Sequence, residues 1–140
     1  MSTPRWEHFE HEADMGVRGY GETIEQAFEQ AALAMASVIT DLDNIEVEKC
    51  IEVECSAPDN DILLVDWLNE IVYQMATHNM LFAKYQVSIS DNKLKARLCG
   101  EQVSQQKHQP AVEIKGATFT ELKVAQSSNG EWIAQCIVDV

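Results

Sequence analysis

Residues 11–21, HEADMGVRGYG, place ligand-type side chains directly before a run of glycines. His11, Glu12 and Asp14 are the polar residues that precede the first of these glycines. A histidine three positions before an aspartate usually makes a local hydrogen bond, and a transition-metal site needs further nitrogen or sulfur ligands nearby. The stretch is therefore either a solvated loop before a strand, or half of a metal site whose other half lies elsewhere.

The chain ends IVDV, with Asp139 one residue before the terminal carboxylate of Val140. Strand alternation places Asp139 on the same face as Gln135 and Ile137. If the last strand lies beside the first strands, Asp14, Asp139 and the Val140 carboxylate converge. Oxygen donors of this kind suit a hard divalent cation, with Ca²⁺ preferred and Mg²⁺ or Mn²⁺ as alternatives. Taken alone, a penultimate aspartate is more often a solvated terminus.

Lys115 lies in the segment HQPAVEIKGATF, within the strand expected over 111–126. An isolated lysine on a strand is normally a solubilising edge charge. The functional alternative is a cation beside the acidic site, in contact with a phosphate or a partner carboxylate. His108, in the preceding polar segment 101–110, is expected in a loop from which it could join Lys115.

The elements that must position these residues follow from hydrophobic periodicity. Thr23 and Gln26 have capping-box spacing before a helix over 23–39, and a second helix is expected over 62–77. Extended segments are expected at 5–11, 15–20, 47–55, 83–89, 94–98, 111–126 and 131–139. Asp91-Asn92 and Asn129-Gly130 are tight-turn signals, and Gly116 is expected to kink the long strand over 111–126.

This order predicts an α+β fold with antiparallel sheets and two main helices. Residues 47–99 read strand–helix–strand–strand, and the flanking segments taken together read the same way. We therefore expect two such units, one inserted in the other, within a single domain spanning 1–140. Two small units of similar order can also arise by chance.

Composition limits the class of protein. The chain has 140 residues and a formal charge of −13, which disfavours a direct grip on nucleic acid and favours a basic partner or a bound cation. Its four cysteines form no CxxC motif, so we expect buried free thiols. With no leader peptide and no membrane-spanning run, we expect a soluble, reduced, cytoplasmic protein. Phosphate-binding loops, GxSxG and HExxH are absent.

In combination, four segments resemble the archease family, in the right order and over about 5–140. HEADMGVRGYGETIEQAFEQAALAMASVITD is similar to the opening of that family, and LLVDWLNEIVYQM to its central helix. HQPAVEIKGATFTELKV resembles its lysine-containing C-terminal strand, and WIAQCIVDV its Asp-hydrophobic terminus. The set is much more specific than any one segment.

The resemblance implies a protein that is an activator and not an enzyme. Archeases assist the 3′–5′ RNA ligase of tRNA splicing and RNA repair, by promoting guanylylation of the ligase histidine and multiple turnover. It implies that Asp14 and Asp139 bind metal together with Val140, and that Lys115 is functionally important. Partner or phosphate contacts of His11 and His108 are further expectations, and no direct contact with nucleic acid or membrane is expected.

Two departures from the family pattern affect these expectations. Glu12 stands where relatives commonly have threonine, which adds a negative charge beside the proposed site. Phe119 stands where many have tyrosine, so a role for a hydroxyl there is in doubt. Two rival functions stay open: a general chaperone for RNA-modifying enzymes such as a tRNA methyltransferase, and a metal-dependent phosphoesterase. The phosphoesterase ranks last because no general base is evident.

Overall fold

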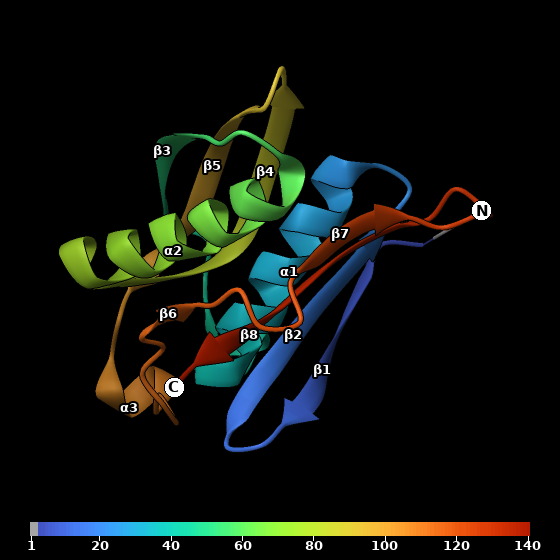
Figure 1. Ribbon diagram of the computed structural model, residues 1–140. Coiled ribbons are helices and arrows are strands. Elements are labelled where there is room, and N and C mark those ends of the chain that lie inside the picture. The colour runs from blue at the N-terminus through green and yellow to red at the C-terminus, as the bar shows by residue number, and fades with distance from the viewer. Residues whose placement is uncertain (1–2) are drawn as a thin grey trace.

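The computed structural model describes residues 3–140, whose strands form two antiparallel sheets (Figure 1). The larger sheet has the order β1-β2-β8-β6, and β7 also pairs with β8. Its strands are β1 (Arg5–His11), β2 (Asp14–Gly21), β6 (Gly116–Ala117), β7 (Lys123–Gln126) and β8 (Trp132–Asp139). The smaller sheet has the order β3-β5-β4. Its strands are β3 (Lys49–Ser56), β4 (Met80–Ser90) and β5 (Lys93–Gln102).

The two sheets follow a nested order along the chain. All strands of the smaller sheet come from one continuous segment, with helix α2 (Asn60–His78) between β3 and β4. The larger sheet and helix α1 (Ile24–Ile39) come from the two flanks of that segment. Short helices η1 (Leu42–Asn44) and α3 (Gln105–His108) complete the fold. The predicted α+β class with antiparallel sheets and two main helices is confirmed, although the outer unit has five strands.

Both main helices begin at a side-chain cap, and for α1 this is the Thr23 that the sequence predicts. Thr23 accepts a hydrogen bond from the Gln26 amide at 3.1 Å, and the Gln26 side chain accepts one from the Glu22 amide at 2.7 Å. Asp59 accepts a bond from the Ile62 amide at 2.9 Å. The Thr23 and Asp59 bonds satisfy first-turn amides that have no partner inside the helix. They therefore fix where each helix starts relative to its strands.

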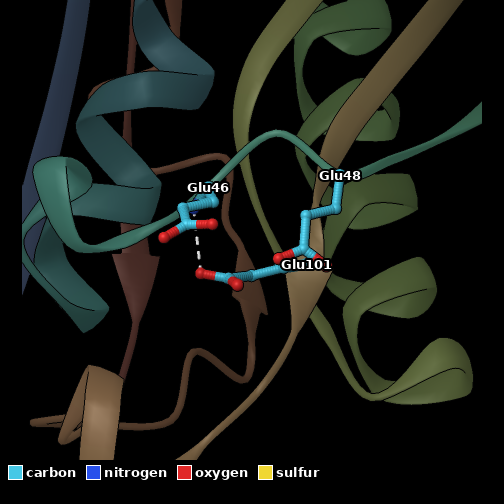
Figure 2. A group of neighbouring side chains, drawn as sticks. All are labelled: Glu46, Glu48 and Glu101. Atoms are coloured by element: carbon cyan, nitrogen blue, oxygen red, sulfur yellow. Dashed lines mark hydrogen bonds between the residues drawn. The ribbon is translucent and has the colours of Figure 1, made fainter.

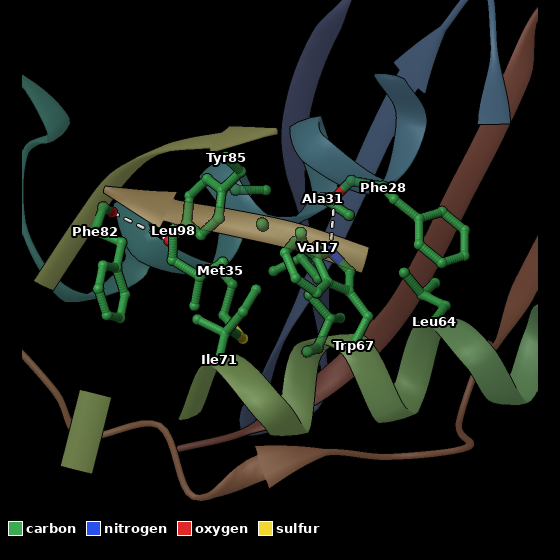
Figure 3. Packing of buried hydrophobic residues seen from close by; sticks show 14 of the residues in the cluster. Val17, Phe28, Ala31, Met35, Leu64, Trp67, Ile71, Phe82, Tyr85 and Leu98 are labelled. Atoms are coloured by element: carbon green, nitrogen blue, oxygen red, sulfur yellow. Dashed lines mark hydrogen bonds between the residues drawn. The ribbon is translucent and has the colours of Figure 1, made fainter. Parts of the chain in front are cut away.

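One hydrophobic core joins the two units (Figure 3). Phe28 and Met35 of α1 pack with Trp67 and Ile71 of α2, and all four side chains are fully buried. The indole N–H of Trp67 donates to the Phe28 carbonyl oxygen at 3.0 Å, so the largest buried side chain keeps its polar group satisfied. The helices of the two units are thus tied to each other directly.

Each main helix also covers a sheet edge of the other unit. Glu29 and Glu25 of α1 accept hydrogen bonds from amides of β4, Val87 at 2.8 Å and Ile89 at 3.4 Å. Burial raises the pKa of Glu29. Reciprocally, α2 side chains accept amides from the larger sheet: Asp61 from Val124 of β7 at 2.9 Å, and Asn69 from Ala117 of β6 at 2.8 Å. Edge amides that would otherwise be unpaired are thereby satisfied.

The prediction of one long strand over 111–126 is wrong. The chain pairs with β8 twice, through β6 and through β7, and forms a loop between them. Thr118 begins the loop by donating from its amide and hydroxyl to the Ile137 carbonyl oxygen, at 3.0 and 2.9 Å. Glu121 has a φ of 55°, and this turn brings the chain back to β8. The loop expected over 101–110 is replaced by the end of β5 and by α3.

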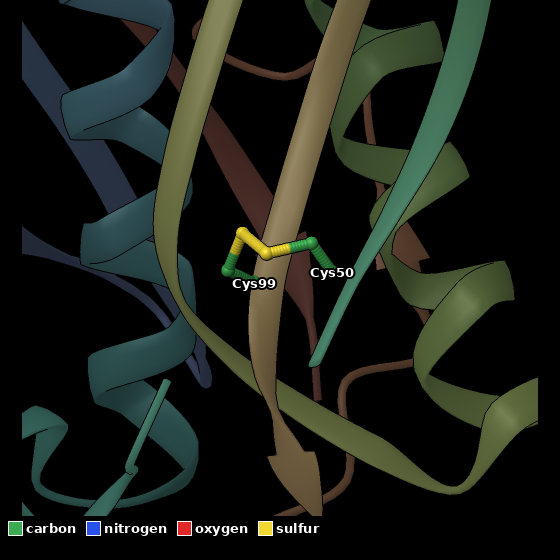
Figure 4. Close-up of a disulfide and its surroundings, with 2 residues drawn as sticks. All are labelled: Cys50 and Cys99. Atoms are coloured by element: carbon green, nitrogen blue, oxygen red, sulfur yellow. A yellow bond between two sulfur atoms is a disulfide. The ribbon is translucent and has the colours of Figure 1, made fainter. Parts of the chain in front are cut away.

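The expectation of free thiols is wrong for one pair of cysteines. Cys50 on β3 lies opposite Cys99 on β5, and the two form a disulfide (Figure 4). Their pairing depends on the β3-β5 register, which joins positions 49 residues apart. Cys136 is a buried free thiol as expected, and burial raises its pKa to about 12. Cys55 is a half-buried free thiol. Among residues 3–140, no helix is long and apolar enough to cross a membrane.

Candidate metal and partner site

Backbone pairing brings the two ends of the chain together at one end of the larger sheet. His11 lies opposite Asp14 in the β1-β2 hairpin, and Met15 lies opposite Val138 in the β2-β8 pair. One step further along that register, Asp14 lies beside Asp139. Asp139 is in turn opposite Gly116 of β6. His11, Asp14, Asp139 and Gly116 therefore form one row across four neighbouring strands.

The two aspartates of this row lie on the same face of the sheet. Val17 of β2 and Cys136 and Val138 of β8 are fully buried, and their strands pack against α1. Because side chains alternate along a strand, Asp14 and Asp139 lie on the opposite face, where Asp139 is exposed. Val140 follows at the same end of β8.

The donor groups of the row fit a hard divalent cation. Among the described residues, neither the Asp14 nor the Asp139 carboxylate has a hydrogen bond or an ion pair that would occupy its oxygens. Carboxylate oxygens are the ligands that Ca²⁺ and Mg²⁺ prefer. Carboxylates on adjacent strands repel each other unless a positive charge lies between them. The chemistry of these residues is therefore suited to holding a cation.

Lys115 is fixed beside the acidic row by its backbone. Its amide donates to the Asp139 carbonyl oxygen at 2.7 Å, one residue before β6 begins. The Lys115 side chain is exposed, and its ammonium group makes no ion pair within the described chain. The Lys115 backbone is thus bonded to the acidic row, and a functional role for its ammonium group stays a prediction.

His108 does not lie with Lys115 on the surface. It is 2 % exposed and belongs to α3, not to a loop. Its Nδ1 accepts a hydrogen bond from the Ser104 amide at 2.8 Å, so Nε2 carries the proton and donates to Glu101 at 2.9 Å. In this structure the ring is an internal hydrogen-bonding group, and contact with an external phosphate would require α3 to move.

A second acidic cluster has no signal in the sequence (Figure 2). Carboxylate oxygens of Glu46, Glu48 and Glu101 lie within 4.8 Å of one another, although Glu101 is distant in the sequence. Glu101 is already held by the Glu46 amide at 2.9 Å and by the Lys107 ammonium at 3.0 Å. These bonds hold its pKa at about 2, the Glu46 amide contributing most. The cluster is a paired structural network that anchors α3.

A groove of about 550 Å³ lies between α2 and the extended segment that leads to β6. Most of its lining is apolar, and Lys115 is one of its lining residues. The apolar lining includes Ile39, Val72, Met75, Val112 and Ile114. The acidic row and this groove therefore share a border at Lys115.

Comparison with known proteins identifies the relatives of this chain. The family model described as "Archease protein family (MTH1598/TM1083)" matches residues 6–140. The chain belongs to the archease family. It is 38% identical over 140 residues to protein archease of Thermococcus kodakarensis, a match that covers 97% of this chain and 99% of that protein. Protein archease of Methanosarcina mazei is 38% identical over 141 residues, covering 97% and 96% of the two chains.

Solved structures agree with this archease membership. The solution structure of Methanobacterium thermoautotrophicum protein 1598 has a TM-score of 0.84 at 34% identity, covering 96% of this chain and 98% of that one. A Thermotoga maritima crystal structure, named as an archease and "possible chaperone", has a TM-score of 0.59 at 16% identity. It covers 100% of this chain and 98% of its own, and at this identity it supports the fold alone. The family match over residues 6–140 includes Asp14, Lys115 and Asp139.

Proposed function

We propose that this archease is a cation-binding accessory factor that activates a 3′–5′ RNA ligase of tRNA splicing and RNA repair. It would promote guanylylation of the ligase's active-site histidine and allow multiple turnovers, without being an enzyme itself. The observation that carries the proposal is the row of neighbouring strands that sets Asp14 beside Asp139, with the Lys115 amide bonded to the Asp139 carbonyl oxygen. Family membership over residues 6–140 supports the choice of partner class.

In the proposed mechanism, the acidic edge docks at the nucleotide site of the ligase. Asp14, Asp139 and the terminal oxygen of Val140 hold a divalent cation, with Ca²⁺ as the first candidate. When bound, the cation supplies neutralisation of phosphate charge during nucleotidyl transfer. Lys115 contacts a phosphate oxygen or a ligase carboxylate, and His11 adds a polar contact beside Asp14.

A guanylylation time course of the cognate ligase, with and without this chain, tests the proposal. Wild-type protein should raise the rate, and Asp139→Ala should abolish the stimulation without unfolding the chain. Asp66→Ala is the matched control, because Asp66 is an exposed aspartate on α2, on a different element from the acidic row. Full stimulation by the Asp139→Ala protein would reject the role given to that residue. Hydrolysis of phosphoesters by the isolated chain would instead favour the phosphoesterase alternative.

A general chaperone for RNA-modifying enzymes, such as a tRNA methyltransferase, is the second candidate. The net charge of −13 supports it, because an acidic surface can shield basic proteins from aggregation. The name "possible chaperone" of the Thermotoga relative points the same way. Suppression of aggregation should survive a chelator and Asp14→Ala, whereas ligase activation should be lost in both cases.

A further inference from the structure

Asn69 connects α2 to the edge strand next to the acidic row. It lies half-buried on α2, and its Oδ1 accepts the Ala117 amide hydrogen at 2.8 Å. Ala117 is the second residue of β6, and Lys115 and Gly116 precede it directly. The bond therefore joins α2 to the short segment that holds Lys115 beside Asp139.

The Ala117 amide has no partner in the sheet. On β6 and the residues around it, the amides of Lys115 and Thr118 point to β8, where they bond the carbonyl oxygens of Asp139 and Ile137 at 2.7 and 3.0 Å. The Ala117 amide points away from β8, toward α2. β6 has only two residues, and the Asn69 bond adds an anchor from α2 to the bonds that this segment makes with β8.

Gly116 gives a second, independent sign of close approach. A Cβ atom at this position would lie 3.1 Å from Asn69 Oδ1, which is closer than ordinary van der Waals contact. The absence of a side chain at Gly116 therefore lets the Asn69 amide reach the strand. The glycine and the asparagine form a matched pair, although they are far apart in the sequence.

We propose that Asn69 is the positioning residue of the acidic edge. By holding the Ala117 amide, it fixes β6 against β8 and sets where Lys115 stands relative to Asp139. The assignment rests on the proposed function for its consequence: Asp139, a proposed cation ligand, lies opposite Gly116 of β6, so a loosened β6 should leave this carboxylate less well placed. Whether Asn69 holds the Ala117 amide is tested separately, by amide hydrogen exchange at residue 117.

The test compares Asn69→Leu, which removes the acceptor, with Asn69→Asp, which keeps a carboxylate oxygen at the same place. Asp61→Leu is the matched control, because Asp61 makes the same type of bond from α2 to the Val124 amide of β7. Amide hydrogen exchange at residue 117 and Ca²⁺ affinity by calorimetry are measured for each full-length variant. Loss of one hydrogen bond should speed exchange at 117 and weaken Ca²⁺ binding by about three- to tenfold in Asn69→Leu.

Asn69→Asp should keep the exchange rate at residue 117 and the Ca²⁺ affinity near those of wild type. Asp61→Leu should speed exchange at residue 124 only. Unchanged exchange at residue 117 in Asn69→Leu would overturn the role of Asn69, as would equal loss of Ca²⁺ affinity in Asp61→Leu. If Asn69→Leu fails to fold, Gly116→Ala replaces it, because the added methyl displaces the Asn69 oxygen and should speed exchange in the same way. A wild-type chain that binds no divalent cation refutes the metal site, and exchange at residue 117 then decides on Asn69 alone.

Discussion

Removal of the Cys50–Cys99 disulfide should lower the stability of the smaller sheet and of the whole chain. The bond closes a loop between residues 49 positions apart. Chain-entropy arguments give about 4 kcal/mol for a loop of this size, and this is an upper value because strain and residual structure reduce it. For a chain of this length, about 1 kcal/mol corresponds to about 3 °C in melting temperature, so the expected fall is up to about 12 °C.

The assay compares thermal unfolding of the untreated chain with that of a chain reduced by dithiothreitol. A Cys50→Ser, Cys99→Ala double variant should melt at the lower temperature in both conditions, because it has no bond to reduce. Thiol titration in denaturant independently counts the free cysteines. Cys55 and Cys136 should react before reduction, and all four cysteines after it. Four reactive thiols without reductant, or a melting temperature that reductant leaves unchanged, would refute the reasoning.

Two further predictions concern the buried polar contacts. The pKa of Glu101 is about 2, below its ordinary 4.5, so its contribution is present above pH 4.5 and is lost as pH falls toward 2. Glu101→Gln should therefore lower the free energy of unfolding by about 1–3 kcal/mol at pH 7. In urea unfolding, the difference in this free energy between wild type and variant should disappear as the pH falls from 4.5 toward 2. Trp67→Phe should cost about 1–3 kcal/mol, since it loses the bond to Phe28 and buried volume, while unfolding stays a single transition.

The sequence predicts those features that depend on neighbouring residues. Thr23 and Gln26 are three positions apart, so their capping bonds follow from spacing alone. The turn at Asp91 and Asn92 likewise needs only residues that tolerate positive φ. The φ angle is 52° at Asp91 and 60° at Asn92. The pairing of the last strand with β2 is less local, and from the sequence it is only a condition for Asp14 and Asp139 to converge; the structure supplies it. It is the step that places Asp14 beside Asp139.

The sequence does not predict features that depend on the register between distant strands. The meeting of Cys50 with Cys99 requires one alignment of β3 on β5, and a slip of one residue would put the two sulfurs on opposite faces. The carboxylates of Glu46 and Glu101 meet for the same reason. His108 illustrates the consequence for function: its side chain type suggests a phosphate contact, but Glu101 and Ser104 hold it inside.

The carboxylates of α1 show why side-chain roles need the tertiary structure. In the sequence, Glu25 and Glu29 read as acidic residues that favour the positive end of a helix. In the fold they accept amides from the edge of β4, while Asn69 of α2 does the same for β6. The helix of each unit accepts hydrogen bonds from an edge strand of the other unit. A displacement of such a strand therefore breaks or lengthens a bond to the helix of the other unit. The acidic edge of the larger sheet is thus held in place by a helix from the inserted unit, which contributes no residue to the row itself.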